Sequence, residues 1–107
     1  MELILNSGKK VEIGITFRKL AELREKNKKA YEEYNRVVTS GAKDVFDYIA
    51  VIYAGYCCNV EAPAMGYQTF LDELPVDINV LIEAFNSLVT RPKKQVLPMN
   101  SENEQEG

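Results

Sequence analysis

The stretch FLDELPVDI, residues 70–78, gathers three carboxylates around one proline. The acids are Asp72, Glu73 and Asp77, and the proline is Pro75. Such carboxylates can act as general acid and base or bind a divalent cation. However, Asp72 and Glu73 are sequence neighbours and would point to different sides of a helix. A calcium loop would need ligands at alternating positions around a glycine. We therefore interpret these acids as residues at helix ends, with Asp77 capping the next helix.

The other groups that could do chemistry also point away from catalysis. The chain has no histidine, which removes the commonest general base and metal ligand. Ser40 and Cys57 have no recognisable base partner, and no GxxxxGK[ST], GxGxxG or GxSxG motif occurs. The adjacent Cys57 and Cys58 are not spaced as CxxC, so we expect buried thiols in a reducing compartment. We expect no enzyme activity, no catalytic residue, no cofactor and no metal.

Size and composition indicate one small domain. A chain of 107 residues with 46% hydrophobic and 27% charged residues can build a single apolar core. No apolar run approaches the ~20 residues that a membrane helix needs, so we expect no membrane contact. The opening MELILNSGKK is too short and too polar for a signal peptide, which predicts a cytoplasmic protein.

Charge is distributed unevenly along the chain. Residues 18–36 carry seven basic and four acidic side chains, a balance of +3, whereas residues 43–83 carry one basic and seven acidic, a balance of −6. This asymmetry suits contacts between copies of the chain or with a charged partner. Two solvated faces of opposite sign would explain it more simply. With a net charge of −3, nucleic-acid binding is the less favoured function.

The N-terminal residues predict a β-hairpin over residues 1–16. ELIL and VEIGIT are rich in strand-forming residues, and NSGKK between them supplies a turn. Val11, Ile13 and Ile15 alternate with polar or small residues, so one face is apolar. A lone hairpin is marginal in water. We therefore expect it to pack on helices or to pair its edge with another chain.

Four helices are expected after the hairpin. Thr16 can cap the first, in which Glu32 and Arg36 have the favourable i,i+4 spacing of an ion pair. The expected helices are a long charged helix over 17–38, an apolar core helix over 43–58, a short helix over 67–74 and a C-terminal helix over 75–90.

The predicted fold is therefore mainly α, an N-terminal β-hairpin followed by about four helices. Residues 1–90 would form one domain, with the hairpin in 1–16 and the helical part in 17–90, and residues 91–107 a flexible, disordered polar tail. The apolar faces of the core and C-terminal helices are candidate surfaces for a partner protein. The candidate residues there are Val45, Ile49, Tyr53, Tyr56, Leu81, Phe85 and Leu88.

Several segments, taken in order, carry a family resemblance. They are MELILNSGKKVEIGIT, FRKLAEL, DVFDYIAVIYAGY, FLDELPVDINVLIEAFNSL and RPKK, which together span roughly residues 1–94. In this order they resemble the tail assembly chaperones of long-tailed, siphovirus-type bacteriophages and prophages of Gram-positive bacteria. No single motif is diagnostic, and the order of elements and the wording AGY…FLDELP carry the resemblance.

The resemblance implies a non-catalytic role in virion assembly. Such chaperones bind the tape measure protein, a long and largely helical polypeptide, and keep it soluble while the major tail protein polymerises around it. They act in the host cytoplasm and are absent from the mature virion. We further expect a homo-oligomer, because copies set along one client could pair their oppositely charged regions.

The family also implies a longer product made by ribosomal frameshifting, which could contact the major tail protein. Here Lys93 and Lys94 could lie over the slip site, and the gene sequence would show whether a slippery heptamer and an overlapping frame exist. The alternative function is a small regulatory or antitoxin-like protein whose basic helix binds nucleic acid or a protein partner. An enzyme that uses the acidic cluster is the third and least favoured interpretation.

Overall fold

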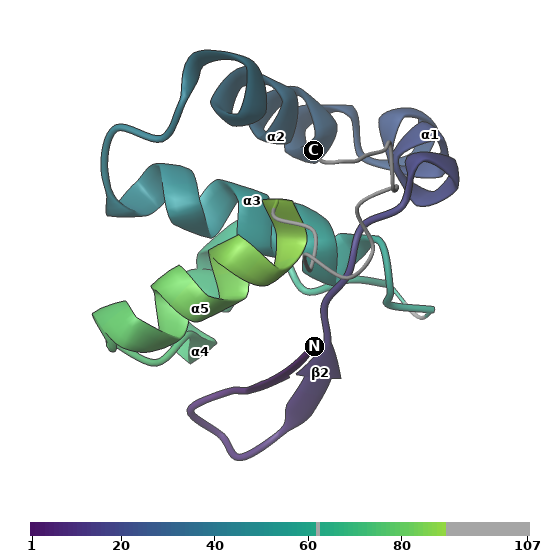
Figure 1. Ribbon diagram of the computed structural model, residues 1–107. Helices are drawn as coiled ribbons and strands as arrows, with labels where there is room; N and C mark the ends of the chain where they lie inside the picture. Colours follow the sequence, from purple (N-terminus) through teal and green to yellow (C-terminus); the bar gives the residue numbers. More distant parts are fainter. Residues whose placement is uncertain (62, 90–107) are drawn as a thin grey trace, which may run out of the picture.

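The computed structural model describes residues 1–61 and 63–89, and within them a two-stranded hairpin precedes five helices (Figure 1). The mainly α fold with an N-terminal hairpin is thus confirmed. The expected tail, residues 91–107, lies outside the described residues. The elements are β1 (Glu2–Ile4), β2 (Lys10–Glu12), α1 (Phe17–Lys26), α2 (Lys28–Ser40), α3 (Val45–Cys57), α4 (Tyr67–Glu73) and α5 (Ile78–Val89).

The hairpin has one buried face, as its alternation predicts. The strands are antiparallel, with Leu3 opposite Val11, and these two side chains are both buried. The turn passes through Gly8 at φ 90°, a conformation that suits glycine. Strand pairing ends at Glu12, earlier than expected, although Ile13 continues into the core. The hairpin therefore packs on the helices through its apolar face.

The hairpin turn is also bonded to the end of α4. The side-chain amide of Asn6 donates to the carbonyl oxygens of Asp72 (3.1 Å) and Leu74 (3.3 Å), and the Asn6 backbone N–H donates to that of Glu73 (2.7 Å). The last carbonyls of a helix have no partner within the helix. Asn6 supplies donors to them, and this fixes the hairpin against α4.

The expected long charged helix is broken in two, so the expectation of one helix over 17–38 is wrong. Asn27 separates α1 from α2, with φ −146° and ψ 77°. Its backbone N–H donates to the carbonyl of Leu23, and its side chain accepts from the N–H of Ala30 (3.2 Å). Asparagine competes in this way with the helical backbone and is a favoured cap. Five helices result where about four were expected.

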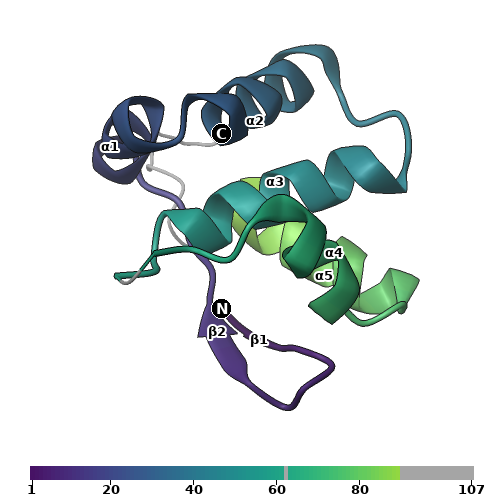
Figure 2. The same ribbon diagram turned by 180° about the vertical axis from the view of Figure 1, so that it is seen from behind.

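Helix α3 is the centre of the molecule, as its apolar sequence predicts. Val51, Ile52 and Ala54 are fully buried, and Asp44 caps the helix by accepting from two backbone N–H groups. Helices α2 and α5 both pack on α3, and α4 lies behind α5 in Figure 1 and in front of it in Figure 2. Gly55 lets α5 approach closely, because a Cβ there would lie 3.0 Å from both Leu88 methyl groups. In the described part of the chain, no helix is long and apolar enough to span a membrane.

Candidate partner-binding surface

The acidic stretch around Pro75 has a structural role. A side-chain oxygen of Glu73 accepts from the backbone N–H of Ser7 (3.1 Å), and that of Asp77 accepts from the N–H of Asn79 (3.0 Å) at the start of α5. The predicted cap is therefore confirmed. Among the described residues, no three histidine, cysteine, aspartate or glutamate side chains lie close enough together to hold a metal ion.

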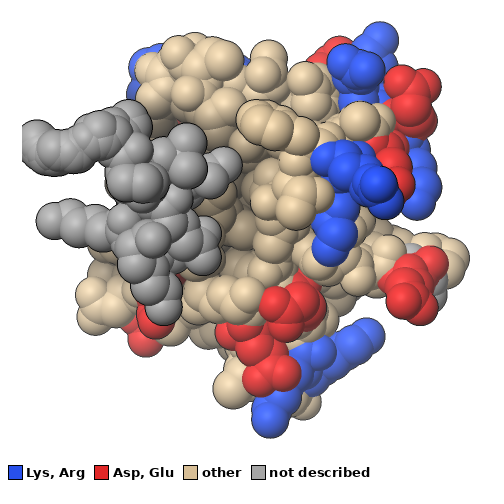
Figure 3. Space-filling view, turned by 45° about the vertical axis from the view of Figure 1, so that its right-hand side comes forward, with Lys and Arg blue, Asp and Glu red and all other residues tan. Residues whose placement is uncertain are grey.

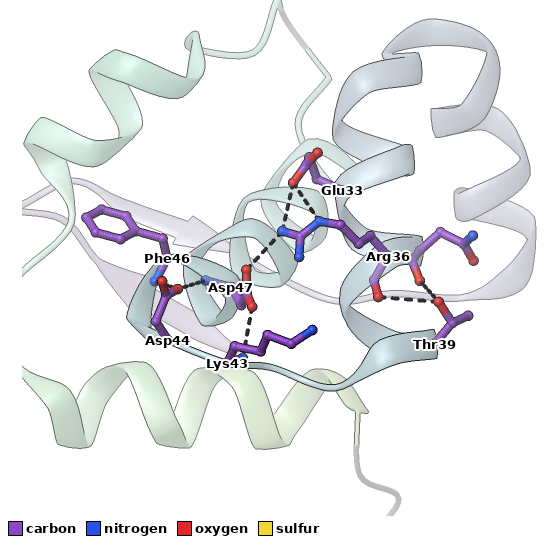
Figure 4. Close-up of polar contacts among 8 residues, drawn as sticks. Glu33, Arg36, Thr39, Lys43, Asp44, Phe46 and Asp47 are labelled. Atoms are coloured by element: carbon purple, nitrogen blue, oxygen red, sulfur yellow. Dashed lines mark hydrogen bonds and ion pairs between the residues drawn. The ribbon is translucent and has the colours of Figure 1, made fainter.

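A charged network ties α2 to α3 (Figure 4). Arg36 Nη2 donates to Asp47 Oδ1 and Glu33 Oε1, both at 2.9 Å, and Asp47 Oδ2 accepts from the backbone N–H of Lys43 (2.9 Å). The bond from Arg36 and then that from Lys43 hold the pKa of Asp47 below its ordinary value. The expected pairing of Arg36 with Glu32 is wrong, because Arg36 turns to Glu33 and across to α3.

An apolar groove lies between α2 and α5, with α3 as its floor. We call this the α2–α5 groove, and its volume is about 510 Å³. No charged residue lines it, and Val38 and Val89 on its two walls are 42% and 41% exposed. The lining residues are Tyr34, Val37, Val38, Gly41, Ala42, Tyr48, Phe85, Leu88 and Val89.

The candidate partner-binding residues are divided between this groove and the core. Phe85 and Leu88 line the groove, where the Phe85 ring packs on Tyr48 at a centroid distance of 4.7 Å. Val45, at the start of α3, is half-buried. The other four are buried, so a partner could reach them only if a neighbouring helix moved. They are Ile49, Tyr53, Tyr56 and Leu81.

The two buried tyrosines hold the loop before α4. The Tyr53 hydroxyl donates to the carbonyl of Met65 (2.8 Å), and the Tyr56 hydroxyl accepts from the N–H of Met65 (3.0 Å). Both rings pack on Phe70, at centroid distances of 5.1 and 5.3 Å. Burial is the main cause that raises the pKa of Tyr53. Both tyrosines therefore have a structural role, in which the ring packs in the core and the hydroxyl group is hydrogen-bonded.

Exposed apolar side chains outside the candidate set were missed by the sequence analysis. Ile78, Ile82 and Val89 on α5 are 52%, 41% and 41% exposed, and Phe17 at the start of α1 is 87% exposed. The helical spacing groups the apolar residues of α5 on one face but does not show which of them pack on α3. A solvent-facing aromatic or aliphatic cluster is typical of a protein-binding surface.

A second hollow, between α2, α3 and α4, differs from the groove in having charged residues in its lining. Its volume is about 460 Å³, and Ala30, Ala50 and Tyr67 contribute to its walls. Lys29, Glu33, Arg36 and Asp47 also line it, and the last three belong to the network that ties α2 to α3. Because that network holds the polar groups in place, this hollow is a weaker candidate than the groove.

The two cysteines are free and half-buried, which corrects the expectation that they are buried. Burial, followed by the neighbouring Cys57, raises the pKa of the Cys58 thiol to about 11, and burial raises that of Cys57. Both therefore remain thiols at neutral pH, and a thiol is a poor nucleophile compared with a thiolate.

The basic side chains of α1 and α2 are mixed with acids. Lys28 lies 4.0 Å from Glu32, and Arg24 lies 3.8 Å from Glu25. In Figure 3, blue and red side chains lie close together at the right-hand side and again at the bottom. Neutralised cations attract a phosphate backbone less strongly than a purely basic stripe would.

A comparison with protein-family models, curated proteins and solved structures found no match to this chain. Function is therefore inferred from the surface itself and from the resemblance carried by the sequence.

Proposed function

We propose that this protein is a non-catalytic tail assembly chaperone that binds a helical client, the tape measure protein of a long-tailed phage or prophage. The observation that carries the proposal is the α2–α5 groove, an open apolar channel with no charged lining residue. The chaperone acts in the host cytoplasm as a homo-oligomer and is absent from the finished virion. A longer frameshifted product would add contact with the major tail protein.

The shape of the groove supports a helix as the bound element. Its two walls are helices and its floor is a third, an arrangement in which an amphipathic helix can lay its apolar side. Covering apolar helix faces is what a chaperone must do for a long helical client before assembly.

Apolar side chains on the groove walls supply the driving force for client binding, and the core does not have to open. Val38 and Val89 expose apolar surface on opposite walls, and Phe85, which packs on Tyr48, lines the groove with them. Burying such surface contributes about 25 cal/mol per Å² before the costs of association. The core residues of α3 keep their packing in this mode, so binding is compatible with a stable fold.

Co-expression tests the proposal. The tape measure protein, expressed with this chain, should move from the insoluble to the soluble fraction and be recovered with it in a pull-down. Val38→Ser together with Val89→Ser should abolish this effect, because both side chains are partly exposed groove walls. Val76→Ser is the matched control, because Val76 is fully exposed outside the groove. Equal solubility with and without the chaperone would overturn the proposal.

The cluster of cations on α1 and α2 supports a second candidate, a regulatory or antitoxin-like protein that binds nucleic acid. In that case micromolar protein would shift DNA or RNA, and the shift would weaken steeply with salt. Arg18→Gln with Lys29→Gln would reduce it, whereas Val38→Ser would not. An unchanged mobility at low salt would exclude this candidate.

A further inference from the structure

Helix α5 carries two separate apolar stripes. Leu81 and Ala84 are buried against the core, together with half-buried Leu88. A second stripe consists of Ile78, Ile82, Phe85 and Val89, which we call the α5 seam. Three of its four side chains are between 41% and 52% exposed. One helix thus holds the fold together with one stripe and exposes most of the other, in which only Phe85 is half-buried and packed on Tyr48.

The α5 seam has the spacing of a coiled-coil seam. Its residues follow one another by four, three and four positions. At about 100° per residue, the four side chains fall within about 60° of one another around the helix. Such 4-3-4 spacing lets the side chains of one helix fit between those of another that lies beside it. The pattern therefore specifies a helical partner with apolar residues at the same spacing.

The seam continues into the α2–α5 groove. Phe85 and Val89 belong to both, and Val38 stands on the opposite wall. A helix that follows the seam would therefore contact α5 along its length and α2 at one end. The residues beside the seam at its polar edge are Asn79 and Asn86, seven positions apart and both exposed. Their amides can bond to the partner without adding charge.

The charge around the seam points to the chemistry of that partner. From Asp44 to Val89 the chain has seven acidic residues and no lysine or arginine. Asp47 is neutralised by Arg36, but Asp77 and Glu83 are sequence neighbours of the seam residues Ile78 and Ile82, about 100° from them around the helix. Their charges would act on the flanks of a helix bound at the seam, and salt would screen that interaction over ~8 Å at physiological ionic strength. A helix with basic flanks is favoured there and one with acidic flanks is repelled.

We propose that the α5 seam is the recognition surface for an amphipathic client helix with apolar residues at 4-3 spacing and lysine or arginine at its flanks. This inference rests on the proposed function, because it names the class of client segment that the groove takes. The acidic residues around the seam would favour client helices with basic flanks, and the seam itself would supply the apolar contact area.

Synthetic helical peptides test the inference on the full chain. Two peptides share one leucine–isoleucine seam and carry either lysine or glutamate at the flanks, and a third has lysine flanks and a scrambled seam. Fluorescence anisotropy should show the lysine peptide binding about tenfold more tightly than the glutamate peptide at low salt. The difference should shrink as salt rises. Equal affinities for the first two peptides, or for the lysine and scrambled peptides, would overturn the inference.

Variants then locate the site. Ile82→Ser should weaken binding of the lysine peptide at least tenfold, and Glu83→Lys should reduce its preference over the glutamate peptide. Ile4→Ser should change neither, because Ile4 is 55% exposed on β1 and lies outside the seam. Binding that survives Ile82→Ser, or a self-associated form that excludes every peptide, would show that the seam is not the recognition surface for a client.

The two proposals fail separately. If the tape measure protein is kept soluble through Val38 and Val89 while the lysine and glutamate peptides bind equally, the proposed function stands and the charge preference is wrong. If the lysine peptide binds at the seam but the tape measure protein stays insoluble, the seam recognises a helix and the proposed client is wrong.

Discussion

Gly55 offers a quantitative test of how closely α5 packs on α3. An added Cβ would lie 3.0 Å from both Leu88 methyl groups and 3.5 Å from the backbone nitrogen of Gly14. Alanine is favoured over glycine within a helix by about 1 kcal/mol. Overpacking a core costs about 1–3 kcal/mol, and the low half of that range applies because Leu88 is half-buried and can rotate.

We therefore expect Gly55→Ala to lower the free energy of unfolding by about 0–1 kcal/mol, as the steric cost slightly exceeds the helix gain. In a Leu88→Ala background the clash is removed, and the same substitution should raise the free energy of unfolding by up to about 1 kcal/mol. The coupling between the two sites should be about 1–2 kcal/mol, within the range of residues in direct contact.

Urea denaturation followed by far-ultraviolet circular dichroism measures all four members of this cycle. The slope of the unfolding free energy against urea should stay constant, which shows that compactness is unchanged. The result that refutes the packing is a Gly55→Ala gain of equal size in both backgrounds, because α5 would then not approach α3 at this position.

The remaining predictions concern stability, acid titration and thiol reactivity. Asn6→Ala should lower the free energy of unfolding by about 1–2 kcal/mol in urea denaturation, because two hydrogen bonds to the end of α4 are lost. Asn86→Ala is the control and should not destabilise the fold, because Asn86 is exposed on α5. Because the pKa of Asp47 is lower in the fold than in the unfolded chain, its stabilising contribution is present at neutral pH and is lost as the pH falls through its folded pKa. Stability measured between about pH 5 and pH 2 should therefore fall less in Asp47→Asn than in the wild type, and an identical fall would count against the bond to Arg36. Cys58, with a pKa of about 11, should alkylate slowly with iodoacetamide at pH 8 and fast only in urea; equally fast native alkylation would show that the thiol is not shielded.

Local signals in the sequence predicted the caps of two helices. Thr16 and Asp77 cap α1 and α5 as expected, because a cap depends on a short polar side chain and the next three residues. The break at Asn27 is also local. It was missed because charged residues continue at helical spacing on both sides, and only the single asparagine marks the interruption.

Contacts between distant segments could not be predicted in this way. Asn6 forms hydrogen bonds with the end of α4, more than sixty residues away in the sequence. Arg36 bonds to Asp47 on α3, although Glu32 is closer to it in the sequence. Sequence periodicity likewise marked the apolar residues of α5 without separating the stripe that packs on α3 from the seam that faces outward. That separation depends on how the helices pack on α3, so the groove residues Val38 and Val89 emerged only from the structure.

Hydrogen exchange on the full chain, with and without a soluble fragment of the tape measure protein, tests directly whether the client binds in the α2–α5 groove. Bound client should slow exchange of backbone amides in α2 from Tyr34 onward and along α5, the two walls of the α2–α5 groove. The amides of α1 and of the hairpin should exchange as in the free protein. Protection confined to α1, or no change anywhere at saturating fragment, would show that the groove does not bind the client.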